Sequence, residues 1–129
     1  MGATILVSPD IQLGEAVVRA LDEAGLEIRA ASWLRLAEAP SWRLVVAMPL
    51  VDQEGPRAGY KAIQKALAKQ PAPLALPLGQ ISVVGLKDPL YRVLRRLVKT
   101  ARRVIRGIRV TDNVVDGVLV HEAYIYRSS

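Results

Sequence analysis

The chain has 129 residues, of which 51% are hydrophobic, 23% are charged and none is cysteine, and its formal net charge at pH 7 is +6. This composition indicates one globular domain with a substantial core, and the lack of cysteine excludes disulfides, thiolate metal sites and a cysteine nucleophile. The single histidine excludes sites that need two imidazoles, while the positive charge favours contact with anions.

The first half of the chain predicts a helix followed by two strands. A helix is expected over 9–24, because a Ser-Pro pair precedes it, apolar residues recur at helical spacing and Gly25 suits its end. Alternating residues over 27–37 and a continuous apolar run over 42–50 predict two strands, which we expect to pair as an antiparallel hairpin.

The second half predicts two further helices with a strand between them. A helix is expected over 56–69, with a proline at its first position, and a Pro-rich loop separates it from a short strand over 80–84. Asp88 followed by proline predicts the start of a third helix, and Gly107 marks its expected end. This third helix is strongly amphipathic, because its apolar and basic residues fall on separate faces.

The last segment, 108–126, predicts a β-hairpin. Asp116-Gly117 is a favoured pair for a two-residue type I′ turn, which would place Val115 opposite Val118. The rest of the register then follows residue by residue. One face of the hairpin is mostly apolar and is expected to point into the core; it comprises Ile108, Val110, Asp112, Val114, Leu119, His121, Ala123 and Ile125.

The predicted element order is therefore α-β-β-α-β-α-β-β over a single domain, 1–129. The expected class is α+β: a two-layer α/β sandwich with a mainly antiparallel or mixed sheet of about five strands. Residues 1–7 are expected to be an edge strand or a loose arm. No apolar run approaches the roughly 18–20 residues of a membrane span, and no leader is recognised, so a cytoplasmic location without membrane contact is expected.

Two segments of the chain carry a resemblance to known sequences. They are WRLVVAMPLVDQEGPRAGYKAIQKAL, over 42–67, and GIRVTDNVVDGVLVHEAYIYR, over 107–127. They resemble segments of an uncharacterised family of small bacterial proteins, and the similarity extends over most of the chain from Ser8 onward. Because that family has no established activity or binding residues, the resemblance implies a bacterial source and no particular function.

Positive charge is concentrated in the middle of the chain. Residues 55–109 hold thirteen Lys or Arg and one acid, a net charge of +12, whereas the segments on either side are acidic. If the second and third predicted helices lie on one side of the sheet, their basic stripes merge into a field that attracts phosphates. The candidate polyanion-binding residues are Arg92, Arg95, Arg96, Lys99, Arg102, Arg103, Arg106, Lys61 and Lys65.

Two other groups of residues suggest chemistry. The hairpin register places Asp112 opposite His121, a pairing that could orient an imidazole for general-base catalysis with a hydroxyl from Ser82 or Ser32, or could simply pin the strand register. Asp52 and a second acid, Glu54, follow an apolar strand and could hold Mg²⁺, although acids there also favour a helix N-terminus.

The sequence therefore favours a non-enzymatic binding or accessory protein without cofactor or metal. Its basic helical face would contact nucleic acid, another polyanion or an acidic protein surface. One alternative is a small hydrolase or nuclease that uses Asp112 and His121. Another is a homo-oligomer in which the basic face meets acidic patches of a second copy, and a face that contacts only solvent is also consistent with the pattern.

Overall fold

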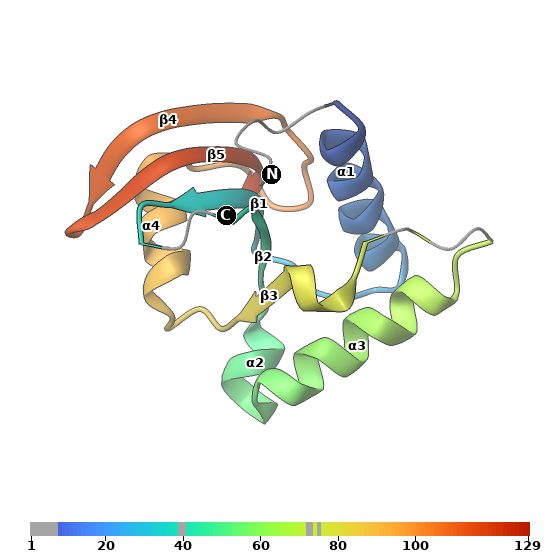
Figure 1. The fold of residues 1–129 in the computed structure, drawn as a ribbon. Helices are drawn as coiled ribbons and strands as arrows, with labels where there is room; N and C mark the ends of the chain where they lie inside the picture. The colour runs from blue at the N-terminus through green and yellow to red at the C-terminus, as the bar shows by residue number, and fades with distance from the viewer. Residues whose placement is uncertain (1–7, 39–40, 72–73, 75) are drawn as a thin grey trace.

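A computed structural model describes residues 8–38, 41–71, 74 and 76–129, so the edge strand or arm expected over 1–7 lies outside the described residues. Figure 1 shows a twisted sheet with helices on both of its faces. In chain order the elements are α1 (Ser8–Glu23), β1 (Ala30–Leu36), β2 (Arg43–Ala47), α2 (Pro49–Glu54), α3 (Pro56–Ala68), η1 (Leu78–Gln80), β3 (Ile81–Val84), α4 (Pro89–Leu97), β4 (Ile108–Val115) and β5 (Val118–Ser128).

The sheet has five strands in the order β3-β2-β1-β5-β4. Its pairs are antiparallel except for β2 and β3, which are parallel and are joined through α2 and α3. The hairpin predicted for the first two strands is confirmed, since β1 pairs with β2 and Ala30 lies opposite Ala47. The α+β class and the mixed five-stranded sheet are likewise as predicted.

Helices cover both faces of the sheet, which adds a third layer to the two expected. On one face α1 and α3 enclose the larger core, where Trp33, Leu44 and Ile63 are buried. On the other face α4 packs through Tyr91 and Leu94 against inward side chains of the central strands. The basic stripes of α3 and α4 are therefore separated by the sheet.

A glycine in α1 lets the helix approach the sheet closely. A Cβ at Gly14 would overlap the Tyr126 hydroxyl and would lie 2.6 Å from Trp33 Nε1. Both aromatic groups use this access to donate to α1 carbonyls, Trp33 Nε1 to Asp10 O at 3.1 Å and Tyr126 Oη to Ile11 O at 2.6 Å. Burial raises the pKa of Tyr126 well above its ordinary value, which keeps this donor protonated.

The end of α1 follows the prediction. Gly25 has φ +80° and closes a Schellman motif, in which Leu26 N donates to Leu21 O and Gly25 N donates to Asp22 O. The strand predicted over 42–50 is too long, and α2 was not predicted, because β2 ends at Ala47. Pro49 begins α2 instead of continuing β2.

The predicted third helix is shorter than expected. Asp88 caps α4 as predicted, since its carboxylate accepts from Leu90 N at 2.9 Å, but the helix ends at Leu97 rather than near Gly107. Residues 98–107 instead form a segment that runs beside the end of β5, where Arg106 N donates to Tyr126 O. These bonds satisfy backbone groups of β5 that β4 does not reach, and this need outweighs the helical pattern.

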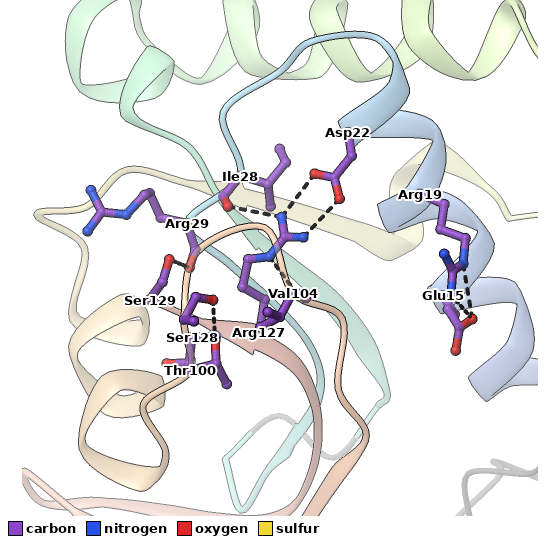
Figure 2. Close-up of polar contacts among 11 residues, drawn as sticks. Glu15, Arg19, Asp22, Ile28, Arg29, Thr100, Val104, Arg127, Ser128 and Ser129 are labelled. Carbon is purple, nitrogen blue, oxygen red and sulfur yellow. Dashed lines mark hydrogen bonds and ion pairs between the residues drawn. The ribbon is translucent and has the colours of Figure 1, made fainter.

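The buried guanidinium of Arg127, on β5, fastens three parts of the chain together (Figure 2). Its Nη1 and Nη2 donate to the two carboxylate oxygens of Asp22, at 3.0 and 2.8 Å, as a two-pronged ion pair. Nη1 also donates to Ile28 O, and Nε donates to Val104 O at 2.8 Å. Arg127 therefore holds α1, the loop after it and segment 98–107 in place.

Candidate polyanion-binding surface

The predicted basic residues lie in two separate places. Lys61 and Lys65 are exposed on α3, on the opposite side of the sheet from α4. The single merged field that a shared face would create is therefore absent from the described residues. The remaining candidates follow one another along α4 and the segment after it; they are Arg92, Arg95 and Arg96 on α4 and Lys99, Arg102, Arg103 and Arg106 on segment 98–107.

A shallow surface groove of about 620 Å³ lies along α4 from Tyr91 onward and continues over the two residues after the helix. Its lining contains four basic residues, and none of the described residues that line it is acidic. We name it the α4 groove. The residues that line it are Tyr91, Arg92, Arg95, Arg96, Leu97, Val98 and Lys99.

Arg95 is held at the floor of the α4 groove by a chain of polar contacts. Its Nη1 donates to Tyr91 Oη at 3.1 Å, and its guanidinium lies 5.9 Å from the centre of the same ring. Tyr91 Oη in turn donates to the backbone oxygen of Ser129 at 2.6 Å. The positive charge of Arg95 is therefore fixed at one position, and little conformational entropy is lost when it contacts a ligand.

The other basic side chains of the α4 groove are less constrained than that of Arg95. Arg96 Nε lies 3.1 Å from Asp116 Oδ2 of the hairpin turn, but both side chains are exposed, so this pair is weak and readily exchanged. Among the described residues, no acid lies within 4.0 Å of Arg92 or Lys99. The groove therefore presents positive charge that the described part of the protein does not neutralise.

The hairpin register is as predicted, but only half of the residues that were predicted to face the core do so. Asp116 and Gly117 both have positive φ, as a type I′ turn requires, and Val115 lies opposite Val118. The alternation breaks in the middle, where Asp112 has φ +48° and β5 bulges against β1. Ile108, Val110, Ala123 and Ile125 face α4 as expected, whereas Val114 and Leu119 lie on the outside.

The break leaves the candidate catalytic pair outside the core, with Asp112 exposed and His121 half-buried. Asp112 is 81% exposed, and its Oδ1 is 3.7 Å from Nδ1 of His121, which is too far for a hydrogen bond. The prediction that both side chains point into the core is therefore wrong. Neither residue lines any of four well-formed cavities in the described part of the chain, the α4 groove among them.

The two serines proposed as nucleophiles are engaged elsewhere. Ser32 is buried and its Oγ donates to backbone oxygens, including Tyr124 O at 3.1 Å. Ser82 Oγ accepts from Arg43 Nε in the strand beside it. The structure does not bring either hydroxyl to His121, so it offers this group no arrangement for nucleophilic catalysis.

The two acids proposed as magnesium ligands have different surroundings in the structure. Asp52, in α2, accepts from Leu86 N at 2.7 Å and from Lys87 N at 3.3 Å, which fastens the loop before α4. Gly85 permits this approach, because a Cβ there would lie 2.5 Å from Asp52 Oδ1. Glu54 is exposed, and the described residues contain no group of three or more metal-ligating side chains.

Asp52→Ala is expected to lower the free energy of unfolding by about 1 kcal/mol, because two backbone N–H groups lose their acceptor. Glu54→Ala is the matched control and should change it by less than about 0.5 kcal/mol. Urea denaturation measures both. A melting temperature that rises with Mg²⁺ in the wild type but not in Asp52→Ala would instead support the metal hypothesis.

Sequence reasoning missed the Arg127–Asp22 pair. Arg127 lies near the end of the predicted hairpin, and regular alternation from Ile125 would place its side chain on the α4 face of the sheet. Instead β5 has a register shift against β1 between Ile125 and Arg127, so that Arg127 lies opposite Ala31 and faces α1. The identity of the acid depends on how α1 packs, which the sequence pattern does not specify.

None of the helices in the described residues is long and apolar enough to cross a membrane. The resemblance to an uncharacterised bacterial family stays a prediction. The chain matches no protein-family model, no curated protein and no solved structure.

Proposed function

We propose that this chain is a non-enzymatic binding protein whose α4 groove contacts the backbone phosphates of a nucleic acid. The observation that carries the proposal is the groove itself, whose lining holds four basic side chains without an acid among the described residues. Each phosphate neutralised there releases condensed counterions, which favours binding at low salt. A cytoplasmic location belongs to the same proposal, because such a ligand is found there.

The aromatic residues favour contact with the backbone rather than with bases. All six Trp and Tyr side chains are buried or half-buried, so none is free to stack on a base. Tyr91, the aromatic residue of the groove, is committed to Arg95 and Ser129. Binding through phosphates alone is insensitive to base sequence and falls steeply as salt rises.

The two alternatives are less well supported. The enzyme hypothesis depended on Asp112, which is exposed, and His121, which is half-buried; neither Ser32 nor Ser82 directs its hydroxyl to them. The homo-oligomer hypothesis needs free acids in the first part of the chain. Asp22 and Asp52 already bind groups of their own chain, whereas Glu23, Glu38 and Glu54 are exposed and remain available to a second copy. Nucleic acid is preferred because the α4 groove gathers four basic side chains without an acid among the described residues that line it.

The test compares two double charge reversals that change net charge equally. Arg92→Glu with Lys99→Glu alters the α4 groove, whereas Lys61→Glu with Lys65→Glu alters α3 across the sheet. We expect the groove variant to bind a duplex of about 20 base pairs at least tenfold more weakly at about 50 mM salt, with a shallower salt dependence. The α3 variant should bind within about threefold of wild type. Fluorescence anisotropy at two salt concentrations measures both.

Equal losses in the two variants would mean that net charge alone drives association and that the groove is no specific contact surface. Absence of wild-type binding at about 50 mM salt would contradict the proposal outright. Circular dichroism spectra of both variants should match the wild type, because all four substituted side chains are exposed.

A further inference from the structure

A second cavity, of about 350 Å³, lies where the end of α1 meets segment 98–107. We name it the α1-end pocket. Its volume falls within the range of pockets that hold small ligands. Figure 2 shows the ion pair of Arg127 and Asp22 between these two parts of the chain. The residues that line the α1-end pocket are Asp22, Gly25, Leu26, Glu27, Ile28, Arg29, Arg102, Arg103 and Arg127.

The lining of the α1-end pocket carries an excess of two positive charges, because it contains four arginines and two acids. Arg127 neutralises Asp22, and Arg29 Nη1 lies 4.0 Å from a carboxylate oxygen of Glu27. The other two arginines of the lining, Arg102 and Arg103, have no such counter-charge, because among the described residues no acid lies within 4.0 Å of either. The pocket thus complements a ligand that carries two negative charges.

The backbone at Arg103 supports a role for its side chain. Arg103 has φ +61°, in the left-handed region that favours glycine and that costs other residues roughly 1 kcal/mol or more. Glycine at this position would remove the strain. A charged side chain held there, in the lining of a positively charged cavity, points to use of the guanidinium rather than to a requirement of the fold.

The end of α1 does not cancel this attraction. A helix C-terminus repels anions through its unpaired carbonyls. Here Ala20 O accepts from Ala24 N, Leu21 O accepts from Leu26 N and Asp22 O accepts from Gly25 N. Arg127 also donates to Ile28 O. The negative end of the helix is therefore largely satisfied before a ligand arrives.

We propose that the α1-end pocket binds a phosphate dianion, either free or as a monoester, with Arg102 and Arg103 as its charged ligands. Arginine suits this role, because its planar guanidinium can donate two parallel hydrogen bonds to phosphate oxygens. The same chemistry is offered by free inorganic phosphate and by a nucleoside monophosphate. The site is separate from the α4 groove, and it does not depend on nucleic-acid binding there.

The test titrates the full chain with inorganic phosphate and, separately, with a nucleoside 5′-monophosphate at constant ionic strength. Amide chemical shifts of 25–29 are expected to move saturably, and calorimetry gives the dissociation constant. Arg103→Gly and Arg102→Gln should each weaken binding about tenfold. Arg103→Gly should nonetheless fold as well as wild type, since it removes the left-handed strain. Arg92→Gln, in the α4 groove, is the control and should bind both ligands within about twofold.

Tighter binding of the monophosphate than of inorganic phosphate would identify an ester as the ligand, and equal binding would identify free phosphate; both support the site. The proposal fails if neither ligand saturates by about 10 mM, or if Arg103→Gly binds as tightly as wild type. Duplex binding measured on the same variants separates the two sites. A loss in Arg92→Gln alone supports the α4 groove, whereas a phosphate response without duplex binding leaves only the α1-end pocket.

Discussion

Replacement of Arg127 by Met is expected to lower the free energy of unfolding by about 3–4 kcal/mol. Arg127 is 1% exposed, and its removal leaves the Asp22 carboxylate without its counter-charge. The carbonyls of Ile28 and Val104 lose their donor at the same time. Arg127→Lys should lose at least about 2 kcal/mol, because a lysine ammonium lacks the planar fork that serves all three groups. Urea denaturation followed by circular dichroism measures the difference.

Arg19→Met provides the matched control. Arg19 also pairs with an acid of α1, Glu15, at 2.9 Å, but the two side chains are 61% and 44% exposed. An exposed pair one helical turn apart contributes less than about 0.5 kcal/mol. If the two arginine variants lose similar amounts, the buried pair does not fasten α1 to the sheet as described.

Gly14→Ala is expected to be the next most harmful change, with a loss of about 2–3 kcal/mol. Alanine raises helix propensity by up to about 1 kcal/mol, so an exposed glycine in α1 would gain from the same substitution. At Gly14 the new methyl group instead meets the ring hydroxyl of Tyr126 and the indole nitrogen of Trp33. Relief of the overlap breaks their hydrogen bonds to α1 and moves the helix away from the sheet.

The control for this variant is Gly79→Ala. A Cβ at Gly79 meets no atom within 4 Å, and the residue has no positive φ. Its stability should stay within about 0.5 kcal/mol of wild type. Thermal unfolding of the two variants distinguishes close packing from a general intolerance of glycine replacement, and a neutral Gly14→Ala would show that α1 can shift without cost.

Features encoded by a few neighbouring residues were predictable. The cap at Asp88, the end of α1 at Gly25 and the turn at Asp116-Gly117 all follow from local backbone chemistry. The length of α4 was not predictable, because residues 98–107 have a helical pattern and yet pair with β5. The outcome there depends on backbone groups of a strand that lies far along the chain.

The candidate site was predictable in its composition and not in its shape. Charge alone singled out Arg92, Lys99 and Arg103 as surface cations. Arg92 and Lys99 line the α4 groove and Arg103 lines the α1-end pocket, because α4 ends at Leu97. The amphipathic pattern continues beyond Leu97 and therefore does not predict this end. The bulge near His121 likewise changes which side chains face the core in the half of the hairpin nearest the turn. No local feature of the sequence predicts this bulge.

The order of the strands has a consequence for how the chain folds. The central strand β1 pairs with β5, so that Ser32 Oγ reaches a carbonyl 92 residues further along the chain. A loop of that length must close before the two halves of the sheet join, and such closure slows folding. While a ribosome is still making β5, β1 keeps one edge unpaired. Segments β1 to β3 are therefore the part of a nascent chain most exposed to association with other chains.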